Sequence, residues 1–359
     1  MNYNELLEKI KTGSELYSYP FKKKTDDDYY DFIFKIWKSY YEDLKKLDEE
    51  SISFLNGCLS GTGVDLPQPL DVIEDSRKVY EMVSFCVHDA LCGLPSEAFR
   101  KMEKFLLGNN LHYVNLLPMI EIPENSFFYR IRHSECTEQK KLFHIAFEER
   151  YKVKSMRYSI PGYPMLYLSS SLKTSYNEYF KDEEKHEFTY AKFQNKELLR
   201  FVDMGFPRIN PEPFELYSFF TFFPLFMACS IDVEHEKEPF KTEYIVSQIL
   251  TQFIKLHAEK KHPESKIDGI SYLPPEMMRG ASVDDIRSKN YALVVQGASL
   301  RRGYDTFLAN KFLMTQPIRV SNNIIDGYIR AKDHGCTSCF FCFLETMHHA
   351  APVLPIDLN

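Results

Sequence analysis

Three residues that could bind and cleave a charged ligand follow one another in the middle of the chain. Arg157 precedes a turn with two prolines, Tyr167 lies in the short apolar stretch after that turn, and Glu178 follows in the next segment. An arginine fork, an aromatic face and a carboxylate suit an anionic ligand that also carries a cationic or oxocarbenium-like centre. The alternative is a surface Arg–Glu pair beside a core tyrosine, which on residue composition alone is the favoured interpretation.

The segment that contains these residues also resembles a known family. Residues 157–178 read RYSIPGYPMLYLSSSLKTSYNE and resemble the core signature of the RES family, which is named for its Arg, Glu and Ser. Further blocks follow in the same order as in its longer bacterial members: FFYRIR at 127–132, LFHIAFE at 142–148, a block within 224–248, and DGISY at 268–272. Several ordered blocks are more specific than one short match.

The resemblance implies a fold related to ADP-ribosyltransferases and, as in the family's toxin members, action on NAD⁺. Arg157, Tyr167 and Glu178 match the family's Arg, active-site Tyr and Glu. Arg130, beside Tyr129, matches the second arginine of the NAD⁺ pocket. We expect NAD⁺ as the substrate and no metal.

Two further site residues are predicted on a weaker basis. Tyr158 lies beside Arg157 among the tyrosines that we expect around the dinucleotide. The family's Ser follows the DGI-x-Y strand in a Pro-Ser step, but here Leu273-Pro274-Pro275 occupies that place. Ser271, within the strand, is the nearest candidate, and strand alternation decides whether it faces the pocket.

The implied reaction breaks the N-glycosidic bond between nicotinamide and ribose. Nicotinamide leaves as a neutral molecule from a cationic ring, so the site must mainly stabilise an oxocarbenium ion, a role for Glu178. Arg157 and Arg130 would hold the phosphates or the ribose, and Tyr167 would pack on the nicotinamide ring. The acceptor of ADP-ribose is left open between water, phosphate and a protein side chain. ADP-ribosyl transfer to a macromolecule and a non-catalytic NAD⁺-binding module are the alternatives.

Two other groups of residues could hold a ligand or take part in chemistry. Cys336, Cys339 and Cys342 recur at every third position near histidines, which would suit zinc or an iron–sulfur cluster. Their phenylalanine-rich surroundings favour a buried C-terminal segment instead. His144 lies between Phe143 and Ile145, which favours a structural hydrogen-bonding role over a catalytic one.

The helices and strands that we expect to position these residues together indicate an α+β fold. Helical spacing dominates the first 120 or so residues, with helices expected near 4–11, 29–55 and 75–91. Short strands are expected at 126–132, 165–168, 187–193, 199–202, 267–272, 291–295 and 318–320, with helices at 171–180 and 240–255. We therefore divide the chain into a mainly helical region, 1–121, of unassigned role and a catalytic region, 122–359, with an ADP-ribosyltransferase-like mixed β core and flanking helices.

Composition limits the class of protein and of partner. The formal charge of −7 over 359 residues lacks the basic excess that nucleic-acid binding favours. Eight scattered cysteines and a charged N-terminus without a long apolar core predict a cytoplasmic protein. Residues 216–231 are uncharged, but Pro224 interrupts them and the stretch is short for a membrane span, so we expect buried core. The resemblance allows a regulatory or antitoxin protein as a partner, and a homo-oligomer stays open.

Overall fold

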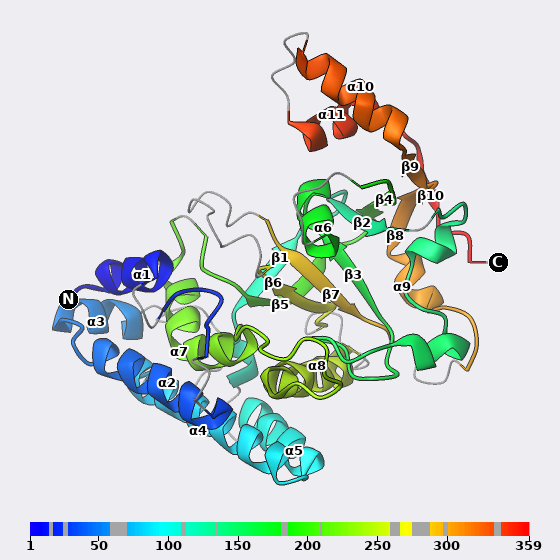
Figure 1. The fold of residues 1–359 in the computed structure, drawn as a ribbon. Coiled ribbons are helices and arrows are strands. Elements are labelled where there is room, and N and C mark those ends of the chain that lie inside the picture. The colour runs from blue at the N-terminus through cyan, green and yellow to red at the C-terminus, as the bar shows by residue number, and fades with distance from the viewer. Residues whose placement is uncertain are drawn as a thin grey trace. The chain divides into compact units, whose positions relative to one another are not determined.

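The computed structural model of the chain contains two compact units (Figure 1). The first comprises Met1–Ile120, Ser155–Ser159 and Val202–His257, and the second comprises Glu121–Lys154, Ile160–Phe201 and Ala258–Asn359. The chain therefore passes between the units more than once. The division that we predicted from the sequence, into residues 1–121 and 122–359, has a single boundary. The structure describes residues 1–13, 17–23, 28–57, 70–108, 113–133, 135–180, 186–208, 210–258, 266–274, 288–296, 301–333 and 339–358.

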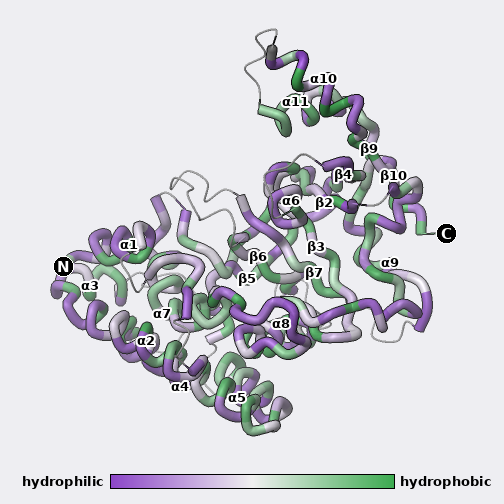
Figure 2. The backbone as a smooth tube through the Cα atoms, in the orientation of Figure 1, coloured by the Kyte–Doolittle hydropathy of each residue, from purple (hydrophilic) through white to green (hydrophobic). Residues whose placement is uncertain are grey.

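The first unit is helical, as the spacing of its apolar residues predicts. Its amphipathic helices show hydrophobic and hydrophilic residues alternating along the tube, most clearly in α4 and α5 (Figure 2). The helices are α1 (Tyr3–Thr12), α2 (Tyr29–Leu44), α3 (Glu49–Gly57), α4 (Val72–Leu91), α5 (Pro95–Leu107), α7 (Pro213–Cys229) and α8 (Ile245–Ala258), with single 3-10 turns at Tyr113–Leu116 and Thr242–Tyr244.

Acidic and amide side chains set where these helices begin. Asn2 caps α1 by accepting a hydrogen bond from the backbone N–H of Glu5, and Asp71 caps α4. The helix predicted over 29–55 is in fact two helices, because α2 ends at Leu44 and Asp48 then accepts from the backbone N–H of Ser51 at 2.8 Å. A second cap inside an apolar pattern starts a new helix, which periodicity alone does not reveal.

Helix α7 forms the centre of the first unit. Every residue from Leu216 to Cys229 is buried, including Pro224 inside the helix. In the described part of the chain, no helix is both long and apolar enough to cross a bilayer. The interpretation of this uncharged stretch as core is therefore confirmed.

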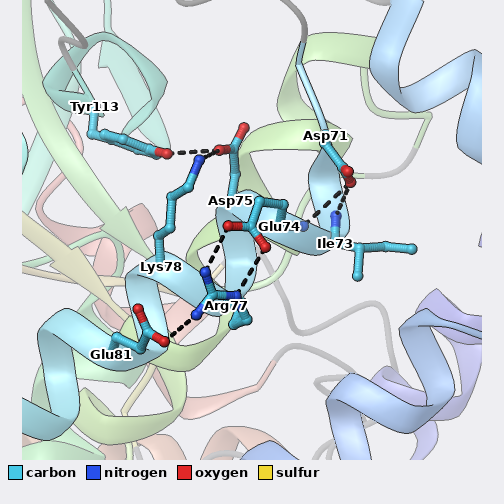
Figure 3. A network of polar contacts seen from close by, with 8 residues as sticks. All are labelled: Asp71, Ile73, Glu74, Asp75, Arg77, Lys78, Glu81 and Tyr113. Carbon is cyan, nitrogen blue, oxygen red and sulfur yellow. Dashed lines mark hydrogen bonds and ion pairs between the residues drawn. The ribbon is translucent and has the colours of Figure 1, made fainter.

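A buried carboxylate ties α7 to the helices around it. Asp75 of α4 accepts hydrogen bonds at 2.6 Å from the phenols of Tyr113 and Tyr217 and lies 3.2 Å from the ammonium of Lys78. Figure 3 shows Tyr113 and Lys78 pointing at this carboxylate. Burial and the Asp75 charge raise the pKa of both tyrosines, so their hydroxyls stay protonated and act as donors. The three elements are thereby held at one point.

The second unit is built on a mixed, largely antiparallel sheet, so the fold is α+β as predicted. The strand order is β1-β5-β6-β7-β3-β2-β4-β8-β10, with β9 paired to β4. The strands are β1 (Met119–Ile122), β2 (Phe127–Arg132), β3 (Met165–Ser169), β4 (Phe188–Asn195), β5 (Leu199–Met204), β6 (Gly269–Tyr272), β7 (Asn290–Val294), β8 (Phe312–Thr315), β9 (Ile318–Val320) and β10 (Val353–Pro355). Strands β1, β8 and β10 were not foreseen. In sequence, β1 and β5 cross the boundary between the units.

Helices of the second unit cover one side of strands β2 and β4. Helix α6 (Leu172–Tyr179) packs there with α10 (Asn322–Asp333) and α11 (Phe340–Met347), while α9 (Thr306–Asn310) precedes β8. Figure 1 shows α6 over the sheet and α10 beside α11. The shared core contains Leu172 and Tyr176 of α6, Ile131 of β2, and the residues Phe188, Tyr190, Val320, Ile325, Tyr328, Phe340 and Leu344.

The DGISY segment is explained by the packing of β6. Asp268 forms a buried ion pair with Lys311 and accepts from the backbone N–H of Arg200 at 2.9 Å. Burial alone would lower the pKa of Lys311, but Asp268 and Glu197 outweigh this effect and raise that pKa. Gly269 pairs with Leu293 of β7 at a very close approach of the two backbones. These contacts fix β6 at the middle of the sheet.

We predict that Gly269→Ala strongly destabilises the protein. A Cβ at this position would lie 2.1 Å from the carbonyl oxygen of Ala292, which is backbone and cannot move aside. We expect the free energy of unfolding to fall by about 3 kcal/mol. Gly57→Ala is the matched control, because nothing lies within 4 Å of its Cβ in α3 and alanine favours the helix. Urea unfolding of both variants measures the difference, and equal midpoints would contradict the steric explanation.

Candidate functional site

Strands β2 and β3 share only a short register in the middle of the sheet. Strand β2 pairs with β4 at all six of its residues, and β3 pairs with β7 at all five of its residues. Between β2 and β3, within the described strands, the register consists of one pair, Tyr129 with Ser169. The two strands therefore offer side chains and backbone groups that no long ladder occupies.

Arg130 lies at this junction and is the most unusual charge of the second unit. Its side chain is buried, with 7% of the residue exposed. One terminal nitrogen, Nη1, donates to the carbonyl oxygen of Tyr167 at 2.8 Å, but Nε has no partner among the described residues. In the described part of the chain no carboxylate forms an ion pair with Arg130. A buried cation without a counter-ion is costly, so the arrangement suits an anionic ligand.

A second arginine adds to the positive charge. Arg132 follows two residues later in β2, so strand alternation places it on the same face as Arg130. Burial, with a contribution from the charge of Arg132, lowers the pKa of Arg130 well below its ordinary value. A guanidinium stays protonated in proteins. The lowered pKa of Arg130 therefore means that its charged form is destabilised by burial, not that the side chain is neutral. A phosphate group would relieve this destabilisation.

Glu178 is held near the same strands by α6. The helix begins after Ser171, whose hydroxyl accepts from the backbone N–H of Thr174 at 3.1 Å. Glu178 lies in the last turn, where its Oε2 accepts from Asn290 Nδ2 at 2.9 Å. Asn290 in turn accepts from the hydroxyl of Ser169 at 2.7 Å. The carboxylate is thus oriented by an amide that is itself fixed by β3.

Strand alternation shows which of these residues share a side of the sheet. Tyr129 lies opposite Ser169, and Ser169 lies opposite Asn290, so all three face the side on which Asn290 meets Glu178. Tyr167 shares that side because it is two residues from Ser169. Burial raises the pKa of Tyr129 to about 12, so its phenol stays neutral. The structure therefore brings Tyr129, Tyr167 and Glu178 to one side.

Ser271 is not on that side. It is fully buried in β6 opposite Tyr291, whereas its neighbour Tyr272 lies opposite Asn290. Its hydroxyl has no hydrogen-bond partner among the described residues. Ser271 thus shares the face of Arg130 and is separated from Glu178 by the sheet, so a direct contact between this serine and the carboxylate is absent from the described structure.

Arg157 and Tyr158 belong to the first unit. The Arg157 guanidinium donates from Nη1 to the carbonyl of Cys229 and from Nη2 to that of Ile231, both at 2.8 Å. Its centre lies 5.3 Å from the ring of Tyr244. Within this unit Arg157 therefore caps the carboxyl end of α7, a role that the sequence did not indicate. A role in ligand binding stays a prediction for both residues.

His144 has the structural role that its apolar neighbours suggest. Nδ1 contacts the carbonyl of Ile145 at 2.7 Å, and Nε2 accepts from the backbone N–H of Asp305 at 2.8 Å. Both ring nitrogens are thus used by the backbone in the neutral tautomer that these contacts assign. Burial lowers the pKa of His144 to about 4, against opposing effects of Ile145 and Asp305 and a reinforcing effect of Arg130.

The expectation of buried cysteines near the C-terminus is wrong for two of them. Cys339 and Cys342 are exposed, while Phe340 and Leu344 fill the core beneath them. Cys336 and His334 lie outside the described residues. Among the described residues no group of three metal-ligating side chains is found.

Three residues of the site were not foreseen. Asn290 and Ser169 orient Glu178, and no pattern in the sequence marks them, because their contacts join segments far apart in the chain. Arg132 could have been found, since alternation in FFYRIR places it beside Arg130.

Comparison with known proteins gives one informative match. The chain is 26% identical over 313 residues to "Putative toxin YopC" of Bacillus subtilis (strain 168), a match that covers 83% of this chain and 67% of that protein. No family model matches the chain. No solved structure matches it significantly. The chain is therefore similar to a protein named as a toxin, and the RES resemblance and the likeness to ADP-ribosyltransferases stay predictions.

We predict that His144 makes stability depend on pH. The unfolded chain takes up a proton at about pH 6.5, whereas the folded protein resists it until about pH 4. Stability is thus complete above pH 6.5 and falls as the pH drops toward 4, by about 3 kcal/mol for this residue. In His144→Gln, which cannot titrate, the loss between pH 7 and pH 4 should be smaller by that amount.

Urea unfolding at both pH values measures this difference. His349→Gln, at an exposed histidine, is the control and should retain the loss seen in the wild type. An unchanged pH dependence in His144→Gln would show that other groups cause it.

Proposed function

We propose that the chain is a toxin-type enzyme that degrades NAD⁺ by cleaving the bond between nicotinamide and ribose. The observation that carries the proposal is the buried guanidinium of Arg130, whose Nε has no partner among the described residues and which lies beside Arg132 rather than a carboxylate. The similarity to a protein named as a toxin and the ordered RES-like blocks support it.

The two arginines suit the pyrophosphate of a dinucleotide. A planar guanidinium can donate two parallel hydrogen bonds to phosphate oxygens, and a buried one does so with little competition from water. Arg130 already uses Nη1 to hold the Tyr167 carbonyl, which fixes the plane of its fork. The remaining N–H groups are then available in one orientation, as a pre-organised anion site requires.

Glu178 would carry the chemistry. Nicotinamide in NAD⁺ is a cationic substituent and leaves without a general acid, so the barrier lies in forming the ribose oxocarbenium ion. A carboxylate oriented beforehand stabilises that ion without reorganising during the reaction. Asn290 supplies the orientation by donating to Oε2, and the carboxylate held in this way would face the ribose or its incoming nucleophile. Tyr129 and Tyr167, on the same side, provide aromatic surfaces for the nicotinamide ring.

The position of Ser271 favours a second candidate, a module that binds NAD⁺ without turning it over. Its hydroxyl lies on the side of the sheet opposite to Glu178, and Leu273-Pro274 follows where the family has its Pro-Ser step. NAD⁺ binding by the wild type, measured by calorimetry, without release of nicotinamide would favour the binding module, and Ser271→Ala tests whether an active enzyme needs the serine. Nicotinamide release that survives this substitution would show that Glu178 acts without the serine.

We predict that Glu178→Gln abolishes nicotinamide release. The amide keeps the shape and the contact with Asn290 but removes the negative charge, so the rate should fall by about 100-fold or more while NAD⁺ binding is retained. Release is measured by chromatography after incubation with NAD⁺. Glu42→Gln, at an exposed residue of α2, is the control. Full activity of Glu178→Gln, or no release by the wild type, would contradict the proposal, and labelled lysate protein would favour ADP-ribosyl transfer.

We predict that Arg130→Met separates stability from binding. Removal of a buried charge without a counter-ion should leave the ligand-free protein equally or more stable to heat, since methionine fills a similar volume. NAD⁺ binding, measured by calorimetry, should weaken by at least about tenfold. Arg319→Met, at a half-exposed arginine paired with Glu135, should bind NAD⁺ like the wild type. A large loss of thermal stability in Arg130→Met would mean that the arginine serves the fold rather than a ligand.

A further inference from the structure

The two exposed cysteines at the start of α11 form a close thiol pair that the proposed reaction does not use. Cys339 is the N-cap residue of the helix, and Cys342 lies in its first turn. Their Sγ atoms are 2.8 Å apart, and Sγ of Cys339 accepts from the backbone N–H of Cys342 at 3.3 Å. Both side chains are exposed to solvent. One turn of helix thus presents two accessible thiols in contact.

The two sulfurs are electrostatically unequal. Partial burial alone would raise the pKa of Cys339, but hydrogen bonds from the Cys342 thiol and from backbone amides at the helix start outweigh it and lower that pKa. The hydrogen bond to Cys339 and, next, burial raise the pKa of Cys342. Cys339 is therefore the sulfur that ionises first, and the thiolate is the reactive form of cysteine.

The pair rests on a packed framework. Phe340, between the two cysteines, is 6% exposed, and Leu344 is fully buried in the core shared with α6. The Phe340 ring lies 5.1 Å from Tyr328 of α10, and Phe341 lies 5.2 Å from Tyr176 of α6. These contacts hold the first turn of α11 in place. Tertiary packing therefore helps to keep the two sulfur atoms close together.

We infer that Cys339 and Cys342 are a redox-active dithiol that exchanges with low-molecular-weight disulfides. The Cys339 thiolate attacks one sulfur of the small disulfide, forming a mixed disulfide and releasing one small thiolate, which takes up the proton that Cys339 lost. The Cys342 thiolate then attacks Cys339 Sγ and releases the second small thiol. Two electrons pass from the protein to the small disulfide, and one Cys339–Cys342 bond forms. This step does not depend on the proposed action on NAD⁺.

The test uses the full chain equilibrated in mixtures of reduced and oxidised glutathione. The intact mass should fall by about 2 Da as one disulfide forms, with the loss of two titratable thiols. Fragmentation of the C-terminal peptide in the mass spectrometer should show that the disulfide joins Cys339 to Cys342. A disulfide that joins either residue to Cys336, or no oxidised form in any glutathione mixture, would overturn the inference.

Single substitutions separate the two roles. Cys342→Ser should accumulate one glutathione on Cys339, because the resolving thiol is missing. Cys339→Ser should accept glutathione at position 342 at least about tenfold more slowly, since Cys342 ionises less readily. Cys92→Ser, at another exposed cysteine, should oxidise like the wild type. Equal labelling of the Cys339→Ser and Cys342→Ser variants would overturn the assignment, as would one equivalent of zinc that protects the thiols in the reduced protein.

Discussion

A guanidinium that is buried without a counter-ion constrains the second unit more than any other single feature. Folding removes Arg130 from water and gives it, among the described residues, a hydrogen bond to the carbonyl of Tyr167. A sequence under selection for stability alone would replace such a residue, because an uncompensated buried charge costs several kcal/mol. Its presence at the short junction of β2 and β3 is what the proposed anion-binding role would account for. The rest of the sheet supplies the stability that tolerates this cost.

The two sides of the sheet divide the tasks of the proposed reaction. On one side lie the arginines of β2, and on the other lie Tyr129, Tyr167 and the Glu178–Asn290 pair. A dinucleotide is long enough to present its phosphates to one set and its nicotinamide ribose to the other, provided that it passes the end of a strand ladder. The register between β2 and β3 is one pair long, so both sets of side chains lie beside a short junction of the sheet.

Local signals predict most of the helices and strands, but they do not show where the chain returns to an earlier unit. Strands β2 to β7 and helices α1, α4 and α6 follow from the period of their apolar residues, although α4 begins after its cap Asp71 and not at residue 75. The return of residues 202–257 to the first unit does not follow from it, because α7 is apolar on every side and its partners are decided by packing. Likewise Arg130 was foreseen from its segment, but Asn290 acts through a contact with Glu178 across more than a hundred residues.

The exposure of Cys339 and Cys342 was not predicted for the same reason, namely that it is decided by packing. In the run from Cys339 to Phe343, composition predicts burial of the whole segment, yet a helix has only one inner face. Phe340 and Leu344 occupy that face, and the positions of Cys339 and Cys342 are thereby turned outward. The core that packs α11 onto α6 thus also determines that its thiols meet solvent. Because α6 carries Glu178, one hydrophobic cluster supports both the proposed carboxylate and the proposed dithiol.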